Sequence, residues 1–273
     1  MCAYMIKAAR EAKVHMSWIN PNPEYEGALV DFVRYCLDRQ RKNIFMEDFV
    51  SFQKKISRTG MYNSLSQTLL KLTSPGVPDI YQGDEIWNYS LVDPDNRRPV
   101  DYAARTAMLD GIRRNFSEPG NTVSALAEMM ANMEDGRIKM YIIWKTLSLR
   151  HDNERLFREG DYRNLSVEGP RAAHVCAFAR VLGKGPSETS LVVIAPRLYG
   201  ALAEIHEPAD RPPFPIGAAV WAGTSVEAPA DANKRYKNIF TGETSNTFGR
   251  DGKSWIALED ALRNFLVALL IPD

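Results

Sequence analysis

The sequence has few of the residues that build disulfide frameworks and metal sites. Its three cysteines, Cys2, Cys36 and Cys176, are an odd number and widely spaced. This pattern favours reduced thiols in a cytoplasmic protein over a disulfide framework. The four histidines, at positions 15, 151, 174 and 206, are scattered, and no cysteine or histidine pair has the spacing of metal ligands. We therefore expect a cytoplasmic protein without a metal ion or other cofactor.

The sequence also lacks an excess of charge of one sign and long apolar runs. Lys+Arg and Asp+Glu balance at 34 each, so no electrostatic footprint for nucleic acid is present. No uninterrupted apolar run reaches the length of a membrane span. The apolar core of Met1–Lys7 is too short for a signal peptide. The expected partners include neither nucleic acid nor a membrane, and the sequence leaves the oligomeric state open.

The pattern of the chain changes at about residue 156. A length of 273 residues allows one large or two ordinary domains. Up to residue 155, apolar residues recur mostly at helical spacing. Beyond it, short β-like runs such as 175–181 and 191–195 are bounded by Gly, Pro and Asn. We expect an α+β fold, with a mostly helical part at 1–155 and an all-β sandwich domain at 156–273.

Two separate helices are expected between residues 45 and 73. Apolar residues recur at helical spacing from Phe45 to Ile56, which predicts a helix that ends near Ser57. The pattern resumes from Met61 to Leu72 and predicts a separate helix over Gly60–Thr73.

The segment Ser74–Tyr102 concentrates residues suited to a sugar site. A turn leads into the short apolar run Val77–Tyr81, which predicts a buried strand. The acids Asp84 and Glu85 and two aromatic residues follow, and the segment ends in the polar cluster Asp93–Arg98. Carboxylates and arginines bond hydroxyl groups, and flat rings cover sugar faces. A carbohydrate site and an ordinary solvated surface loop are both compatible with this spacing.

The amino-acid sequence of this segment resembles motifs of a known protein family. Gly76–Glu85 resembles the last barrel strand and following loop of the α-amylase superfamily. Asp93–Tyr102, together with Lys13–Trp18 and Pro21–Glu26, resembles the maltooligosyltrehalose synthase family within it. Met16 departs from the small hydroxyl residue expected there, which would remove a hydrogen bond if this position touched sugar.

The resemblance implies a function for a larger protein. It implies a maltooligosaccharide or α-glucan substrate, whose terminal α-1,4 link is converted to an α,α-1,1 link by intramolecular transglycosylation. It places the nucleophile, the general acid and a stabilising Asp upstream of residue 1, so we expect no catalytic residue in this chain. Residues 1–155 would be the end of a βα barrel with a helical insertion. The isolated chain would be an inactive C-terminal part, with the missing N-terminal part as a possible partner.

The candidate substrate-binding residues follow from the same motifs. They are His15, Trp18, Asp84, Glu85, Asp93, Asn96, Arg97 and Arg98. For Trp18 and His15, the structural alternative is a buried indole beside a satisfied imidazole. For the arginines, the alternative is an internal network with Asp93 or Asp95.

A function of another class stays open for the β-rich part. It would be a carbohydrate-binding module with Trp221, Tyr236 and Trp255 as candidate platforms, or a structural cap for a barrel. Structural burial of these rings is the competing interpretation.

Overall fold

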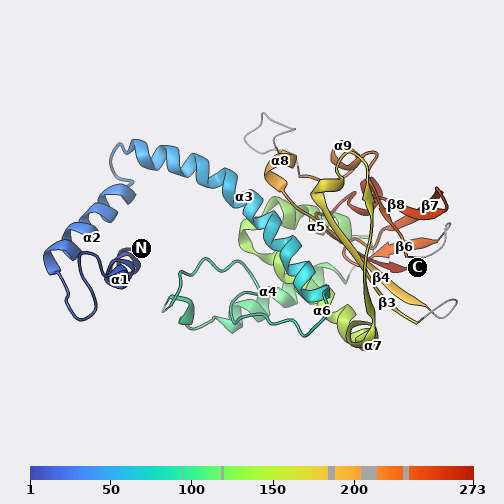
Figure 1. The fold of residues 1–273 in the computed structure, drawn as a ribbon, viewed down its shortest axis with the longest axis horizontal. Coiled ribbons are helices and arrows are strands. Elements are labelled where there is room, and N and C mark those ends of the chain that lie inside the picture. The colour runs from blue at the N-terminus through green and yellow to red at the C-terminus, as the bar shows by residue number, and fades with distance from the viewer. Residues whose placement is uncertain (94, 118–119, 184–187, 204–213, 230–233) are drawn as a thin grey trace. The chain divides into compact units, whose positions relative to one another are not determined.

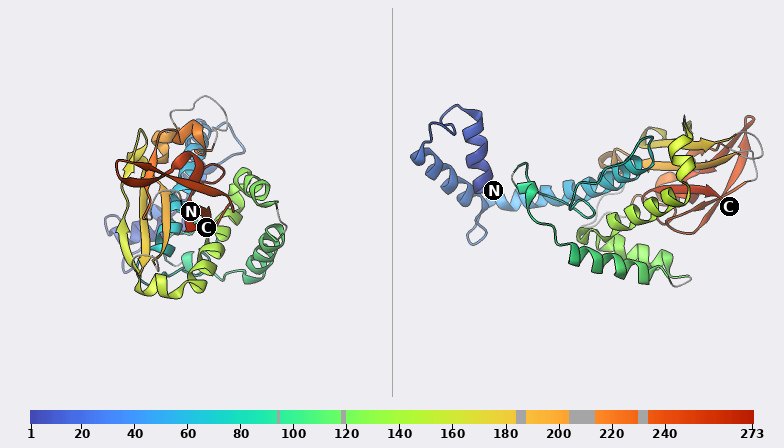
Figure 2. Two further views of the ribbon diagram at one scale, coloured as in Figure 1. Left: turned by 90° about the vertical axis from the view of Figure 1, so that its right-hand side faces the viewer. Right: turned by 90° about the horizontal axis from the view of Figure 1, so that it is seen from below.

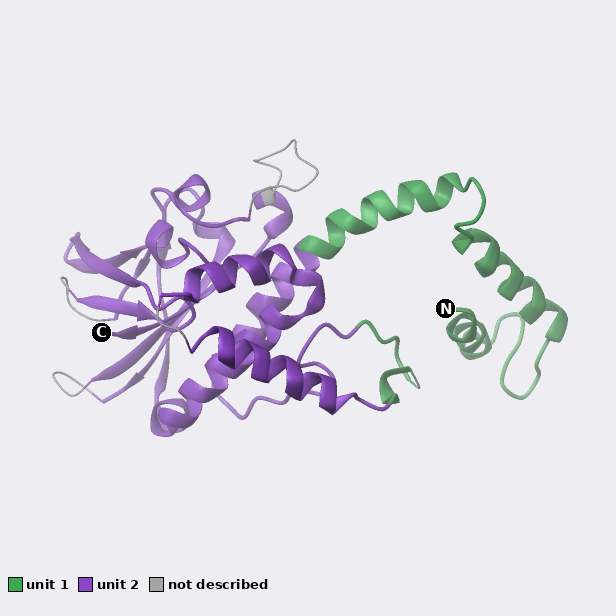
Figure 3. Ribbon diagram, turned by 180° about the vertical axis from the view of Figure 1, so that it is seen from behind, with its two compact units in different colours: residues 1–58, 89–98 green, residues 59–88, 99–273 purple. Residues whose placement is uncertain are grey.

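The chain forms two compact units. The structure, a computed structural model, describes residues 1–93, 95–117, 120–183, 188–203, 214–229 and 234–273. Unit 1 comprises Met1–Arg58 with Tyr89–Arg98, and unit 2 comprises Thr59–Asn88 with Pro99–Asp273 (Figure 3). The expected boundary between residues 155 and 156 falls inside unit 2, and the two-domain division stays a prediction.

Unit 1 is helical. It contains α1 (Cys2–Ala12), α2 (Pro23–Leu37), the first half of α3 (Ile44–Thr73) and the short 3-10 helix η1 (Asp95–Arg97) (Figure 1). Asn22 caps α2 by accepting from the Tyr25 amide at 3.1 Å, next to Pro23 in the first helical position. Arg10 on α1 forms two hydrogen bonds with the Glu26 carboxylate on α2, at 2.7 and 2.8 Å. This bidentate pair fixes the two helices against each other.

One continuous helix stands where two were expected. The predicted break between Ser57 and Gly60 is wrong, because α3 runs unbroken over 30 residues. A single glycine in a helix costs only about 1 kcal/mol relative to alanine. In the unit 2 half of α3, Leu65 and Leu69 are completely buried, and this burial outweighs the weak helix propensity of Gly60.

The remaining helices belong to unit 2. They are α4 (Tyr102–Asn115), α5 (Thr122–Ala131), η2 (Met133–Asp135), α6 (Arg137–Asp152), α7 (Glu154–Glu159), η3 (Ala172–His174), α8 (Tyr199–Ala203), α9 (Ala218–Trp221) and α10 (Leu258–Ala261). Asp101 caps α4, as expected, by accepting from the Ala104 amide at 2.8 Å. Within the described ranges, no helix combines the length and apolarity required to span a membrane.

The strands form one curled antiparallel sheet. They are β1 (Asp161–Asn164), β2 (Val167–Glu168), β3 (Val175–Leu182), β4 (Thr189–Pro196), β5 (Ser225–Glu227), β6 (Arg235–Asn238), β7 (Thr244–Arg250), β8 (Lys253–Ala257) and β9 (Ala268–Pro272). Their order is β1-β3-β4-β9-β6-β7-β8-β5-β2.

Strand β7 pairs with a strand on each side, and this is why the strands form one sheet rather than two. Its residues 244–246 pair with β6, and residues 247–250 pair with β8. Figure 2 shows the curl of the sheet, whose last strands are drawn in red. A β-rich C-terminal part is therefore confirmed, but one curled sheet stands in place of the expected two-sheet sandwich.

The expected barrel strand at Val77–Tyr81 is wrong. The structure assigns no strand to these residues, and Val77 is 96% exposed. Pro78 has no amide hydrogen to donate to a ladder. A strand also needs a neighbour, and the described strands all lie beyond residue 160. The segment is instead an extended connection after α3.

The core of unit 2 joins helices to the sheet. The cluster of buried side chains includes Leu65 and Leu69 from α3, Ile142 from α6, and Val193 and Leu269 from the sheet. Polar contacts fix the same layers: Ser66 donates to the Pro196 carbonyl at 2.7 Å, and the Tyr141 hydroxyl donates to the Phe240 carbonyl at 2.6 Å. Burial raises the pKa of Tyr141, so this hydroxyl remains a donor.

Arg180 on β3 is the largest charged side chain that is fully buried in the described part of this core. Its side chain is 1% exposed and donates to four backbone carbonyls, those of Thr73 at 3.3 Å, Leu156 at 3.4 Å, Phe157 at 2.9 Å and Gly160 at 2.8 Å. The carbonyls come from the end of α3, from α7 and from Gly160 between α7 and β1. Arg180 therefore joins three segments that are distant in sequence.

Replacing Arg180 by Ala is expected to lower the free energy of unfolding by about 2–4 kcal/mol, because four buried or partly buried carbonyls lose this donor. Urea denaturation of the full chain measures this change. The control is Arg155→Ala, since Arg155 is 75% exposed and pairs with Glu159 on its own helix. That variant should stay within about 0.5 kcal/mol of the wild type. Equal effects of the two substitutions would contradict the assigned role of Arg180.

Candidate functional site

The loop between α3 and α4 carries the two candidate acids of unit 2. After Gly76, with φ 108°, the chain is extended, and a turn closes with the Asp84 amide donating to the Tyr81 carbonyl at 2.9 Å. Gly83 sits in this turn with φ 94° and is buried, so a side chain there would be strained. The turn brings Asp84 and Glu85 to the α4 side of the loop.

Different partners hold the two acids. Arg105 on α4 donates to the Glu85 carboxylate at 3.1 Å and to the Gly83 carbonyl at 3.2 Å. Asp84 accepts from the Asn88 side-chain amide at 2.7 Å. Arg105 was not recognised from the sequence. Its position four residues after the helix cap Asp101 does not predict a contact with Glu85, which lies 20 residues earlier in the sequence.

The far end of the loop is fixed at the start of α6. The Trp87 indole donates to the Met133 carbonyl at 2.5 Å, and Lys139 donates to the Ile86 carbonyl at 3.2 Å. Burial lowers the pKa of Lys139, while the nearby carboxylates of Asp84 and Glu85 oppose this shift. Two hydrogen bonds therefore attach this part of the loop to η2 and α6, with the Lys139 ammonium 5.8 Å from the centre of the Trp87 ring.

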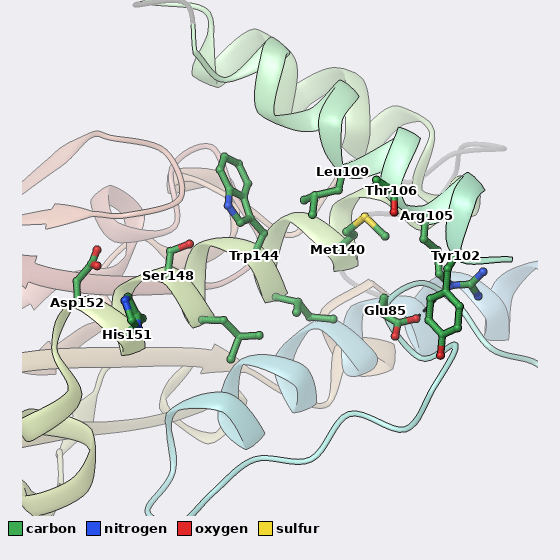
Figure 4. A pocket seen from close by; sticks show the side chains of 12 residues that line it. Glu85, Tyr102, Arg105, Thr106, Leu109, Met140, Trp144, Ser148, His151 and Asp152 are labelled. Atoms are coloured by element: carbon green, nitrogen blue, oxygen red, sulfur yellow. Dashed lines mark hydrogen bonds and ion pairs between the residues drawn. The ribbon is translucent and has the colours of Figure 1, made fainter. Parts of the chain in front are cut away.

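An open groove of about 680 Å³ runs between α4 and α6 (Figure 4). It is lined by Glu85, Tyr102, Arg105, Thr106, Leu109, Met140, Ile143, Trp144, Leu147, Ser148, His151 and Asp152. Glu85 and Arg105 lie with Tyr102 at one end, and His151 and Asp152 lie at the other (Figure 4). Glu85 is the one candidate from the sequence that lines this groove.

In unit 1, His15 and Trp18 follow α1. Both side chains are exposed, Trp18 by 56%, so the alternative of a buried indole is wrong. The Arg10 guanidinium lies 5.0 Å from the centre of the Trp18 ring, and the His15 ring lies 5.1 Å from that of Tyr25. Met16 between them is only 4% exposed. The departure from the family pattern at Met16 is therefore a buried side chain.

The polar cluster Asp93–Arg98 also lies in unit 1, where Pro94 is outside the described residues. Arg97 pairs with Asp93, and Arg98 pairs with Asp95. The guanidinium side chains remain 72% and 79% exposed. The backbone carbonyl of Asp93 accepts from Lys7, and Asp95 accepts from the Leu91 amide at 2.8 Å. The internal arginine–carboxylate network is formed, and the predicted sugar contacts of Asp93, Asn96, Arg97 and Arg98 stay predictions.

The three aromatic residues proposed as platforms on the β-rich part are buried. Trp221 and Tyr236 have no exposed surface, and Trp255 is 2% exposed. The indoles donate to the Pro215 carbonyl at 2.9 Å and the Arg250 carbonyl at 3.3 Å. A ring enclosed on both faces cannot stack on a sugar, so these residues provide no binding platform.

The part of the chain that the structure describes contains no set of side chains that could bind a metal ion. There, no group of three or more His, Cys, Asp or Glu side chains is arranged to hold an ion. Near Arg105, Glu85 instead pairs with the Arg105 guanidinium, and Asp84 accepts from the Asn88 side-chain amide.

Comparison with known proteins shows which proteins the chain is similar to. No family model matches it. A putative maltooligosyl trehalose synthase of Mycobacterium tuberculosis is 35% identical over 177 residues, which are 65% of this chain and 20% of that protein. The solved maltooligosyltrehalose synthase of Arthrobacter ramosus matches with a TM-score of 0.73 at 28% identity, over 100% of this chain and 30% of the synthase. The chain is homologous to maltooligosyltrehalose synthases.

A further solved maltooligosyl trehalose synthase supports this relationship. It matches 100% of the chain with a TM-score of 0.67 at 30% identity, and 30% of its own length is covered. The chain thus spans about a fifth of the curated synthases and under a third of these solved ones. The resemblance read from residues 13–26 and 76–102 is confirmed at the level of the family.

Gly136 gives a test of how the loop is attached. It has φ 80° at the start of α6, and a Cβ there would lie 2.7 Å from Ile86 Cβ. Gly136→Ala is therefore expected to lower the free energy of unfolding by about 2 kcal/mol. The change should also shift Trp87 fluorescence, because the loop must move. Urea denaturation followed by fluorescence measures both effects.

The matched control is Gly111→Ala in α4. At Gly111 a Cβ would meet only the Arg114 guanidinium at 3.9 Å, and the residue is helical. This change should be neutral or stabilising by up to about 1 kcal/mol. A stable Gly136→Ala variant with unchanged fluorescence would show that the loop does not depend on this contact.

Proposed function

We propose that the chain is the C-terminal part of a maltooligosyltrehalose synthase. The observation that carries the proposal is the match of the whole chain to 30% of the Arthrobacter ramosus synthase at a TM-score of 0.73. In this proposal the complete enzyme converts the terminal α-1,4 link of a maltooligosaccharide to an α,α-1,1 link by intramolecular transglycosylation.

The chemistry requires more than this chain provides. A retaining glycosidase mechanism uses two carboxylates about 5–5.5 Å apart, one as nucleophile and one as acid and base. In our proposal these acids belong to the rest of the synthase. Asp84 and Glu85 serve as supports, because each carboxylate already accepts from a protein donor. The isolated chain is inactive on this account.

Unit 1 supplies the best candidates for contact with sugar. Trp18 is an exposed indole, and an exposed ring can stack on the apolar face of a glucose unit. His15 lies three residues before it and can bond a hydroxyl group. The exposed guanidinium side chains of Arg97 and Arg98 can do the same without leaving their carboxylate partners.

A structural role is the second candidate for the β-rich part. The burial of Trp221 and Trp255 favours it over a carbohydrate-binding module. We propose that residues 156–273 form a non-catalytic C-terminal domain, and that residues 1–155 complete the catalytic part of the synthase.

The proposal is tested with the chain alone and with a chimera. The pure chain should leave maltopentaose unchanged, because it lacks the catalytic acids. Replacing the matched segment of the Arthrobacter ramosus synthase by this chain should give an enzyme that forms a non-reducing product, measured by loss of reducing ends and by chromatography. Product from the chain alone would contradict the placement of the acids. A folded chimera without activity would contradict the proposed function.

The role of Trp18 is tested in the same chimera. Trp18→Ala should raise KM roughly fivefold, since losing a stacking contact costs about 1 kcal/mol. The control is Tyr35→Ala on α2, because Tyr35 is also an exposed aromatic, at 62%, beside an arginine. That variant should leave KM unchanged. An unchanged KM for Trp18→Ala would remove the sugar contact from the proposal.

A further inference from the structure

The groove between α4 and α6 is bordered by a row of side chains from each helix. On α6, Met140, Ile143 and Leu147 are spaced by three and four residues and share one face. On α4, Tyr102 and Leu109 lie seven residues apart and also share a face. Leu147 remains 38% exposed and Tyr102 remains 56% exposed. Rows of large side chains on two neighbouring helices form a groove into which a third segment can pack.

The middle of the groove favours an apolar occupant. Leu109, Met140 and Trp144 lie between its two charged ends (Figure 4). At one end, Glu85 is already paired with Arg105 at 3.1 Å. Covering the exposed apolar side chains would remove their surface from water, which stabilises by about 25 cal/mol per Å².

The aromatic ring in the groove is poorly placed to stack on a sugar. The Arg113 guanidinium lies 5.8 Å from the centre of the Trp144 ring, and the Lys145 ammonium lies 5.6 Å from it. Cations at these distances interact with the face of an indole and would compete with a sugar for it. A polypeptide segment therefore suits the groove better than a glucan does.

The proposed function supplies such a segment. The chain matches 30% of the Arthrobacter ramosus synthase, so most of that enzyme lies outside the matched part. In the proposal, residues 1–155 complete the catalytic part of the synthase. The two portions of polypeptide must then share a buried apolar interface, since one domain is built around one core. A groove between two apolar rows is what such an interface leaves open when one portion is considered alone.

We propose that an apolar segment of the polypeptide that precedes this chain in the complete synthase fills the groove between α4 and α6. This inference rests on the proposed function and adds to it the surface on unit 2 that the preceding polypeptide covers. In the complete enzyme, Leu147 and Tyr102 are then buried. The groove is part of the core of that enzyme and binds neither sugar nor a second copy of this chain.

Cysteine labelling tests the proposal in the isolated chain and in the chimera with the Arthrobacter ramosus synthase. Leu147→Cys and Tyr102→Cys each place a thiol at an exposed position along the groove. Each thiol should react with a maleimide at least about tenfold more slowly in the chimera than in the isolated chain, because a covered thiol is reached only through local opening. Mass spectrometry of the labelled peptides separates these thiols from Cys2, Cys36 and Cys176.

The matched control is Arg155→Cys. Arg155 is 75% exposed and pairs with Glu159 on its own helix, so it needs no further partner. The labelling rate of this variant should differ by less than about twofold between the isolated chain and the chimera.

The outcomes separate this inference from the proposed function. An active chimera in which Leu147→Cys and Tyr102→Cys react as fast as in the isolated chain overturns the inference and leaves the proposed function in place. Two results with the isolated chain also overturn it: slower labelling with maltopentaose, which indicates a sugar site, and slower labelling at higher protein concentration, which indicates a second copy. A folded chimera without activity overturns the proposed function, and the inference with it.

Discussion

Two arginines from other elements, Arg180 on β3 and Arg150 on α6, bind the C-terminal end of α3 and so determine where the loop with Asp84 and Glu85 begins. Arg180 donates to the Thr73 carbonyl, and Arg150 donates to the carbonyls of Leu72 and Gly76 at 3.0 and 2.5 Å. The last carbonyls of a helix have no partner within it, and this end of the helix dipole attracts cations. Burial lowers the pKa of both guanidinium groups, yet arginine remains protonated in proteins. The charges therefore hold the end of α3 and fix the point at which the chain leaves it.

The loop that follows keeps its conformation without regular secondary structure. Arg105, the Trp87 indole and Lys139 each donate to backbone carbonyls, within the loop or in η2. Each contact satisfies a group that a strand or helix would otherwise satisfy within its own ladder. Close packing of the loop against Gly136 completes the attachment, because there is no room for a side chain at that position. The position of Glu85 is thus a consequence of long-range contacts rather than of its neighbours in sequence.

The parts of the fold that the sequence predicts are those that depend on local chemistry. The cap Asp101 and the strands β3 and β4 agree with expectation, because a cap needs one residue and a buried strand needs an apolar run. The failures share one cause. The expected strand at Val77–Tyr81 required a neighbour, and the break near Gly60 was outweighed by burial farther along α3. The sequence motifs identified the family, but the contacts of Arg105 with the loop could not be predicted without the three-dimensional structure.

The partners of Asp84 and Glu85 decide how these acids should be understood. A catalytic pair must present two carboxylates to one bond, and one of them must be able to give up a proton. Here Glu85 accepts from a guanidinium that also holds Gly83, and Asp84 accepts from an amide on the following turn. Each acid thus stabilises the loop through a different donor. The groove beside Glu85 is lined by apolar side chains such as Met140, Ile143 and Leu147 as well as by polar ones, and Glu85 is already paired with Arg105 there. These contacts favour a supporting role for the two acids in this loop.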